Sequence, residues 1–273
     1  LGYSKKEWVE KVDLLEHELV REAMKKTGVT KGVEITFLSD VPAAGTGLGS
    51  SSTVTVGVLN ALYQYTGKAV DAERLACEAC EIEIEILGKP IGVQDQYIAA
   101  YGGVEFIEFR KDGVISVEPL LLGEEILADL GSSMMVFFTG KTRKADSVLK
   151  EQKDNIGRKN KVLQEMAQQA RVGRRLVKEG KIAELGKLLD EGWKLKKSLA
   201  SKISDGEIDQ IYAAAKKAGA FGGKISGAGG GGFMTLFVPT SKREAVRKAM
   251  NGLREMPVGL ANSGSRVIFN IAR

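Results

Sequence analysis

The spacing of apolar residues predicts mostly helices, with short strands between them. Residues 1–27 have the period of one or two amphipathic helices that end at Gly28, and the run Val33–Leu38 alternates as a strand does. Further helices are predicted at 53–65, 71–87 (capped by Asp71), 93–101, 144–199 (two long segments that meet near Gly180), 204–218 and 242–254, and further strands at 102–109, 114–118, 133–138, 233–238 and 266–271. Because the strands come in antiparallel-looking pairs separated by helices, we expect an α+β fold.

Length and charge narrow the class of protein. At 273 residues, with 43% hydrophobic and 27% charged residues, the chain can bury one large core or two modest ones. No apolar run reaches the roughly 18–20 residues that a membrane helix needs, and no signal peptide is visible, so we expect a cytoplasmic protein without a membrane partner. The net charge of +5 suits anionic small molecules but is too small to indicate nucleic acid. The basic residues between 150 and 178 are interleaved with glutamate and glutamine, as on a solvated helix face.

Histidine and cysteine offer little for nucleophilic catalysis. The one histidine, His17, lies in the charged amphipathic segment 14–26, where we expect it to face solvent or a partner helix. Cys77 and Cys80 form a C-x-x-C inside a helical pattern, but zinc would need two further ligands and the chain holds one histidine. A general base must therefore be sought among the carboxylates and lysines.

A stretch rich in glycine and serine, VPAAGTGLGSSS at Val41–Ser52, joins the predicted strand 33–38 to the predicted helix 53–65. Glycine lets backbone N–H groups approach a ligand, and a helix N-terminus adds unpaired donors and partial positive charge. The serines could add hydroxyl groups for phosphate oxygens or for a magnesium ion. The stretch favours a phosphate-binding loop, and the alternative is an ordinary strand–helix connection in which one serine caps the helix.

Two other glycine signals differ from nucleotide-binding motifs. GAGGGG at Gly227–Gly232 matches G-x-G-x-x-G, but it leads into the predicted strand FMTLFV, whereas a dinucleotide site opens a helix. GKT at 140–142 resembles the end of a P-loop, yet Met135 occupies the place of the leading glycine. The apolar neighbours Ile225 and Phe233 favour a close approach of the loop at 227–232 to a partner loop or ligand.

Carboxylates are the candidates for acid–base and metal chemistry. Glu81, Glu83 and Glu85 alternate with isoleucines, so the three cannot share one face of a helix and one is expected to turn inwards. A buried carboxylate without a basic neighbour usually holds a cation or a proton. Asp95 precedes a short predicted helix, where it is either a carboxylate stabilised by the helix dipole or the helix cap.

Three of these stretches, in this order and spacing, resemble the motifs of the GHMP kinases. PAAGTGLGSS at 42–51 is similar to the second motif of the family, KISGAGGGGF at 224–233 to the third, and GVQDQ at 92–96 to the G-I-M-D-Q of galactokinases. Within the family, GVQDQYIAAYGG, FFTGKTRKADSVLKEQ, EGWKLKKSLASKIS and SGSRVIF most resemble the sugar kinases that phosphorylate D-glycero-D-manno-heptose 7-phosphate at its anomeric hydroxyl. The resemblance extends from about residue 33 to the end of the chain.

The resemblance implies an ATP-dependent sugar kinase that uses Mg²⁺. Asp95 would orient or deprotonate the attacking hydroxyl, and Ser51 and Glu83 would be the magnesium ligands. Arg143 is our own candidate for binding the distal phosphate of the sugar, because its planar guanidinium matches phosphate; a surface ion pair is the alternative. The residues implied to bind ATP are Pro42, Gly45, Gly47, Leu48, Gly49, Ser50, Ser51 and Ser52. Those implied to close against the phosphate loop and the substrate are Gly227, Ala228, Gly229 and Gly230.

The resemblance also implies a two-domain fold. An N-terminal ATP-binding part similar to domain 2 of ribosomal protein S5 is expected at 1–130, and a ferredoxin-like α/β part at 131–273. The first motif of the family is not found, so we expect a further N-terminal segment that carries this motif and the opening strands. The implied partners are ATP and a phosphorylated sugar, and the implied state is a monomer or homodimer. The alternatives are another acceptor of the family, such as galactose, fucose or mevalonate, and a nucleotide-binding module without catalysis.

Overall fold

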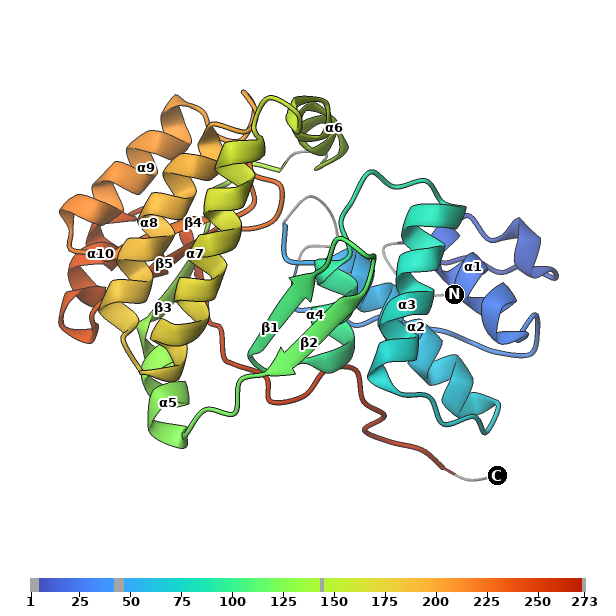
Figure 1. Ribbon diagram of the computed structural model, residues 1–273. Helices are drawn as coiled ribbons and strands as arrows, with labels where there is room; N and C mark the ends of the chain where they lie inside the picture. The colour runs from blue at the N-terminus through green and yellow to red at the C-terminus, as the bar shows by residue number, and fades with distance from the viewer. Residues whose placement is uncertain (1–4, 42–46, 143–144, 272–273) are drawn as a thin grey trace. The chain divides into compact units, whose positions relative to one another are not determined.

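The computed structural model describes residues 5–41, 47–142 and 145–271, which form two compact units (Figure 1). Among these residues, unit 1 comprises 5–41, 49–107 and 261–271, and unit 2 comprises 47–48, 108–142 and 145–260. The mixture of helices and strands confirms the predicted α+β class. The predicted domain division at residue 130 stays a prediction.

Unit 1 is a cluster of helices in which α2 packs against α1, α3 and α4. Its core contains fully buried apolar side chains from three of these helices, including Val20, Val56 and Ala76. The helices are η1 (Val12–Leu14), α1 (Glu18–Thr27), α2 (Ser50–Tyr65), α3 (Ala72–Cys80), η2 (Glu81–Ile86) and α4 (Gln94–Tyr101). As predicted, α1 ends at Gly28, and Asp71 caps α3 by accepting a hydrogen bond from Arg74 N at 2.8 Å.

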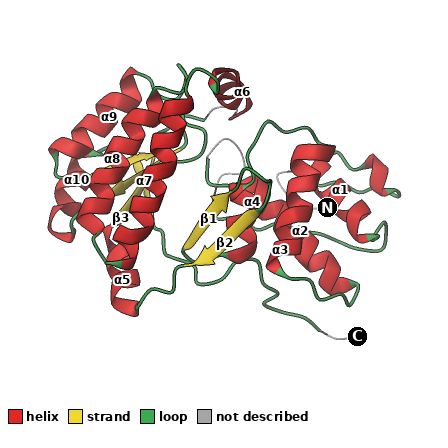
Figure 2. Ribbon diagram, viewed as in Figure 1, coloured by secondary structure: helices red, strands yellow, loops and turns green. Residues whose placement is uncertain are grey.

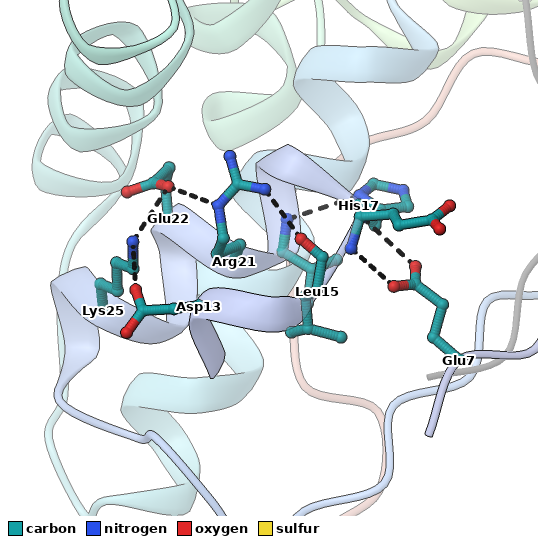
Figure 3. Close-up of polar contacts among 9 residues, drawn as sticks. Glu7, Asp13, Leu15, His17, Arg21, Glu22 and Lys25 are labelled. Atoms are coloured by element: carbon teal, nitrogen blue, oxygen red, sulfur yellow. Dashed lines mark hydrogen bonds and ion pairs between the residues drawn. The ribbon is translucent and has the colours of Figure 1, made fainter. Parts of the chain in front are cut away.

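The segment before α1 is not the helix that the sequence predicted. Among residues 5–17 only the short turn η1 is helical, and α1 begins after His17. The Glu7 carboxylate accepts hydrogen bonds from Glu16 N at 2.6 Å and His17 N at 3.2 Å, and His17 Nδ1 accepts one from Val20 N (Figure 3). These contacts hold the chain in a capping conformation. His17 is therefore a helix cap, with its ring stacked on Phe37 at a centroid distance of 5.8 Å.

Stability is expected to fall at acidic pH because of His17. Burial lowers the pKa of His17 below its ordinary value of 6.5, so the unfolded chain takes up this proton at higher pH than the folded chain. The contribution of His17 is present above pH 6.5 and is lost as the pH falls below it. The melting temperature, followed by circular dichroism, should drop between about pH 7.5 and about pH 5.5. His17→Asn keeps a capping side chain and removes the one histidine, so its drop should be smaller; an equal drop would contradict the assignment.

Two predicted strands of unit 1 are wrong. Within the described residues, Val33–Leu38 has only a single bridge at Thr36, and 266–271 has no strand. Leu38 is 95% exposed and Ile268 is 84% exposed, so their apolar side chains gain no core. An alternating pattern needs a neighbouring strand to complete its hydrogen bonds, and the described residues supply these two segments with only the single bridge at Thr36. Residues 33–37 instead line a cavity of about 860 Å³ together with residues between 5 and 32.

Unit 2 is built on a four-stranded antiparallel sheet in the order β4-β5-β3-β6. Figure 2 shows this sheet behind α7 and α8, and α8 packs against β4 and β5. Its core is a cluster of buried side chains that includes Phe137, Trp193, Ile225 and Met234. The strands are β3 (Met134–Phe138), β4 (Gly222–Ile225), β5 (Phe233–Phe237) and β6 (Arg254–Met256). Outside this sheet, β1 (Glu105–Phe109), which begins in unit 1 and ends in unit 2, pairs with β2 (Ile115–Pro119) and confirms the predicted hairpin.

The helices of unit 2 differ from the prediction in their breaks. The segment predicted as two helices forms three, and the helix predicted at 242–254 ends at Ala249, after which the chain enters β6. The helices are α5 (Glu124–Ser133), α6 (Ala145–Asn155), α7 (Asn160–Lys178), α8 (Ile182–Lys197), α9 (Gly206–Lys217), η3 (Thr240–Lys242) and α10 (Arg243–Ala249). Among the described residues, no helix has the length and apolar character that crossing a bilayer requires.

Candidate functional site

The N-terminus of α2 has a feature that anion-binding helices share. Its cap position is Gly49, with φ of 68°, and this residue has no side chain with which to cap the helix. By contrast, His17, Asp71 and Asp205 cap α1, α3 and α9 with their own side chains. The serine-cap alternative is therefore wrong, because Ser50 and Ser51 already lie in the first helical turn. The N–H groups of this turn, with the positive end of the helix dipole, suit an anion.

The isoleucine–glutamate alternation corresponds to a π-helix. α3 continues into η2, where Leu87 N donates to Ile82 O, five residues earlier, at 3.0 Å. This wider turn separates the three glutamates: Glu83 is fully buried, Glu85 is exposed, and Glu81 pairs with Lys26 at 2.5 Å. The prediction that one glutamate turns inwards is confirmed. π-helical turns are rare and frequently lie at functional sites.

Glu83 receives its side-chain hydrogen bonds from two neutral groups. Ser51 Oγ donates to Glu83 Oε2 at 2.7 Å, and Gln96 Nε2 donates to Glu83 Oε1 at 3.1 Å. These donors lie on α2 and α4, so three separate segments of unit 1 meet at this carboxylate. Since neither donor carries a positive charge, the negative charge of an ionised Glu83 is not neutralised by them.

Asp95 lies beside the same helix terminus. It is the second residue of α4, whose cap is Val93, so the capping alternative for Asp95 is wrong. A Cβ atom placed on Gly49 would lie 3.4 Å from Asp95 Cγ, which means that the carboxyl group packs directly against the glycine backbone. Gln94 Nε2 donates to Asp95 Oδ1 at 3.2 Å. Asp95 is partly exposed and Ser51 is exposed, so both are accessible from outside unit 1.

A network of tyrosines holds α4 against α3. Tyr97 and Tyr101 each donate to a different oxygen of Glu73, both at 2.8 Å, and their rings stack at 6.2 Å. Burial above all raises the pKa of Tyr97, so its hydroxyl remains protonated and keeps donating to Glu73. This anchoring defines the position of the helix that carries Asp95 and Gln96.

In unit 2, the second glycine loop packs against Gly47. A Cβ atom on Gly227 would lie 2.6 Å from Gly47 Cα, and one on Gly47 would lie 2.6 Å from Ser226 O. The loop joins the antiparallel strands β4 and β5, which agrees with the rejection of a dinucleotide motif. Gly230 N donates to Ile203 O at 2.7 Å and Lys196 Nζ donates to Gly227 O. The predicted close approach of this loop to a partner loop is thereby confirmed.

Several predicted site residues do not belong to the group formed by Ser51, Glu83 and Asp95. Pro42, Gly45 and Arg143 lie outside the described residues. Ser52 is 3% exposed, so its side chain faces the interior of unit 1, whereas Leu48 is 37% exposed. Ala228 accepts a weak hydrogen bond from Gln152 Nε2 at 3.5 Å, and a Cβ on Gly229 would lie 2.9 Å from Ile203 O.

No role for Gln96 was predicted from the sequence. The signal was its place in GVQDQ, directly after the candidate base. A glutamine in the first turn of a helix is ordinarily exposed, so burial could not be predicted from that signal.

The residues present suit a magnesium ion. Ser51 and Glu83 supply a hydroxyl and a carboxylate oxygen, which are hard donors, and the two groups already lie within hydrogen-bonding distance. Within the described ranges no group of three or more His, Cys, Asp and Glu could hold a metal ion. Mg²⁺ typically takes one or two protein oxygens and completes its shell with substrate phosphates and water. The donor set therefore fits Mg²⁺ bound together with a phosphate ligand.

Comparison with known proteins identifies the family. The family model described as GHMP kinases N terminal domain matches residues 15–103, and the one described as GHMP kinases C terminal matches residues 174–254. The D-glycero-alpha-D-manno-heptose 7-phosphate kinase of Campylobacter jejuni is 35% identical over 214 residues, or 78% of this chain. The chain spans 63% of the length of that relative.

Solved structures agree with this result. One is the crystal structure of a D-glycero-D-manno-heptose 1-phosphate kinase from Bacteroides thetaiotaomicron, whose sequence is 29% identical to this one. Its TM-score is 0.70, and the match covers 97% of this chain and 76% of that one. Another is described as a sugar kinase from Campylobacter jejuni, and its sequence is 30% identical to this one. Its TM-score is 0.70, and the match covers 90% of this chain and 72% of that one. The two matched family domains, the relative from Campylobacter jejuni and these structural similarities lead to one conclusion: the chain belongs to the GHMP kinase family.

Proposed function

We propose that the protein is an ATP-dependent kinase that phosphorylates the anomeric hydroxyl of D-glycero-D-manno-heptose 7-phosphate, in nucleotide-heptose biosynthesis. The observation that carries the proposal is the convergence of Ser51, Glu83 and Asp95 at the N-terminus of α2. The resemblance to heptose phosphate kinases supports the choice of acceptor. Because its substrate is ATP, we infer a cytoplasmic protein.

Phosphoryl transfer requires alignment and charge stabilisation more than covalent participation by the protein. The N–H groups around Gly47, Gly49 and Ser50 are assigned to the ATP phosphates, where the helix dipole stabilises their charge. The sugar oxygen attacks the γ-phosphorus, and the bond from that phosphorus to the β–γ bridging oxygen breaks, so ADP leaves with the electron pair. Asp95 is assigned to orient the attacking hydroxyl and accept its proton.

Ser51 and Glu83 are assigned to hold Mg²⁺, which when bound would neutralise phosphate charge. The carboxylate of Glu83 supplies negative charge, and Ser51 is placed beside it at the helix terminus. Residues 227–230 are assigned to the substrate, and Arg143 stays our candidate for its distal phosphate. The chemistry needs no histidine, which agrees with the capping role of His17.

A panel of acceptors tests the proposal. We expect the purified protein, supplied with ATP and Mg²⁺, to release ADP fastest with D-glycero-D-manno-heptose 7-phosphate. Galactose, fucose and mevalonate are the comparison acceptors, and unphosphorylated heptose tests whether the distal phosphate is recognised. The position of the new phosphate is read by ³¹P NMR. Faster turnover of another acceptor would overturn the substrate, and ATP binding without transfer to any acceptor would indicate a nucleotide-binding module.

A further inference from the structure

Gln96 connects the two carboxylates of the candidate site. Its side chain is fully buried, its Nε2 donates to Glu83 Oε1 at 3.1 Å, and its backbone directly follows Asp95 in the first turn of α4. We propose that Gln96 is a positioning residue that holds the Glu83 carboxylate in the orientation in which it binds Mg²⁺. This inference rests on the function proposed above.

The orientation of the Gln96 amide follows from its neighbour. An ionised carboxylate only accepts hydrogen bonds, so the NH₂ group must face Glu83; the flipped amide would set two acceptors against each other. In this orientation Gln96 Oε1 is buried and has no hydrogen-bond partner among the residues that the structure describes. A buried amide oxygen without a partner costs stability. We infer that the glutamine serves the placement of Glu83 more than the stability of the core.

The two anchors of Glu83 differ in what they can do when a cation is bound. Ser51 holds Oε2, but Ser51 is itself assigned as a magnesium ligand. Gln96 holds Oε1 from the buried side and has no assigned role at the metal. Gln96 is therefore the anchor that would remain if the Ser51 oxygen were to bind a cation.

A neutral donor suits this position better than a charged one. A lysine or arginine at this place would neutralise Glu83 and compete with Mg²⁺ for the carboxylate. An amide restrains one oxygen without bringing a positive charge that would compete with the cation. Residues that orient metal ligands in this way typically change metal affinity by about 10- to 100-fold when they are removed. Because Gln96 adjoins Asp95, the same helix turn places both the metal ligand and the assigned base.

The test is the magnesium dependence of ATP binding in Gln96→Met, which keeps a side chain of similar length and removes the amide. Isothermal titration calorimetry at a series of Mg²⁺ concentrations gives the Mg²⁺ midpoint without relying on turnover. We expect the midpoint to rise by about 10- to 100-fold, with ATP affinity in the absence of Mg²⁺ unchanged. Tyr63→Phe is the matched control. It removes the buried hydrogen bond from Tyr63 OH to Glu78 Oε2, 2.6 Å long, so it should lower the melting temperature and leave the midpoint unchanged.

Glu83→Gln separates failure of this inference from failure of the proposed site. A raised midpoint in Glu83→Gln with an unchanged midpoint in Gln96→Met overturns the role of Gln96 and leaves the metal site standing. Unchanged midpoints in both variants overturn the metal assignment itself, and the role of Gln96 with it. If Gln96→Met does not fold, Gln96→Asn, which is one methylene too short to reach Glu83, is measured instead; an unchanged midpoint there also overturns the inference.

Discussion

Asp95→Asn is expected to lower kcat by about 10²- to 10⁴-fold, which is the usual contribution of a general base. Asparagine has nearly the same shape as aspartate, so it can keep the packing of residue 95 against Gly49. A Cβ atom placed on Gly49 would lie 3.4 Å from Asp95 Cγ. It cannot accept the proton of the sugar hydroxyl, because its amide has no basic oxygen at neutral pH. ATP affinity should therefore persist while ADP release in the presence of acceptor is lost.

Two measurements make this expectation decisive. ATP affinity is determined by calorimetry and turnover by a coupled assay of ADP release, on the same preparation. Asp112→Asn makes the same chemical change in the exposed β1–β2 turn, where Asp112 pairs with Arg110 at 2.9 Å, and should leave both quantities unchanged. Near-normal turnover in Asp95→Asn would remove Asp95 from the mechanism, and loss of ATP binding would show that its charge serves the nucleotide.

Gly227→Ala is expected to lower kcat/KM by about 10²-fold. A displacement of a reacting group by about 1 Å lowers the rate by this factor. The added Cβ would lie 2.6 Å from Gly47 Cα and 3.0 Å from Gly47 O. Both neighbours are backbone atoms, so they cannot rotate away as a flexible side chain can. The loop at 227–232 or Gly47 must shift, and Gly47 belongs to the stretch assigned to the ATP phosphates.

The control for Gly227→Ala is Gly252→Ala, because both glycines have positive φ, 66° and 90°. A Cβ on Gly252 meets no atom within 4 Å, so this variant carries the backbone strain of about 1–2 kcal/mol without the steric clash. We expect both variants to lower the melting temperature and only Gly227→Ala to lower kcat/KM. Equal losses of kcat/KM would mean that backbone strain, and not contact with Gly47, explains the effect.

Local signals were sufficient for some helix boundaries and for one feature of the site. The cap at Asp71 and the end of α1 at Gly28 depend on a few neighbouring residues, so the sequence alone predicted them. The alternation of glutamate and isoleucine over 81–86 violates the 3.6-residue period, and this local conflict predicted that one carboxylate turns inwards. Helix starts were predicted less accurately. The helix predicted to begin at residue 53 begins at Ser50, because Gly49 occupies the cap position.

Pairing between segments that are remote in the sequence decided which strands form. Val33–Leu38 and β4 show the contrast. The first has the alternation of a strand but pairs only at a single bridge, whereas β4, with two glycines, is a strand because β5 lies beside it. A strand exists only where a partner completes its hydrogen bonds, and the partner is a property of the folded chain.

The same limit applies to the candidate site. The sequence by itself determined which residue types are present: glycines and serines at 45–52, an inward glutamate and an aspartate near the start of a short helix. Only the tertiary structure decided that Ser51 contacts Glu83 across 32 positions of sequence and that Gln96 holds the other carboxylate oxygen. The physical reason is that a hydrogen bond depends on distances of about 3 Å, and such distances between remote segments are set by the packing of α2, α4 and η2.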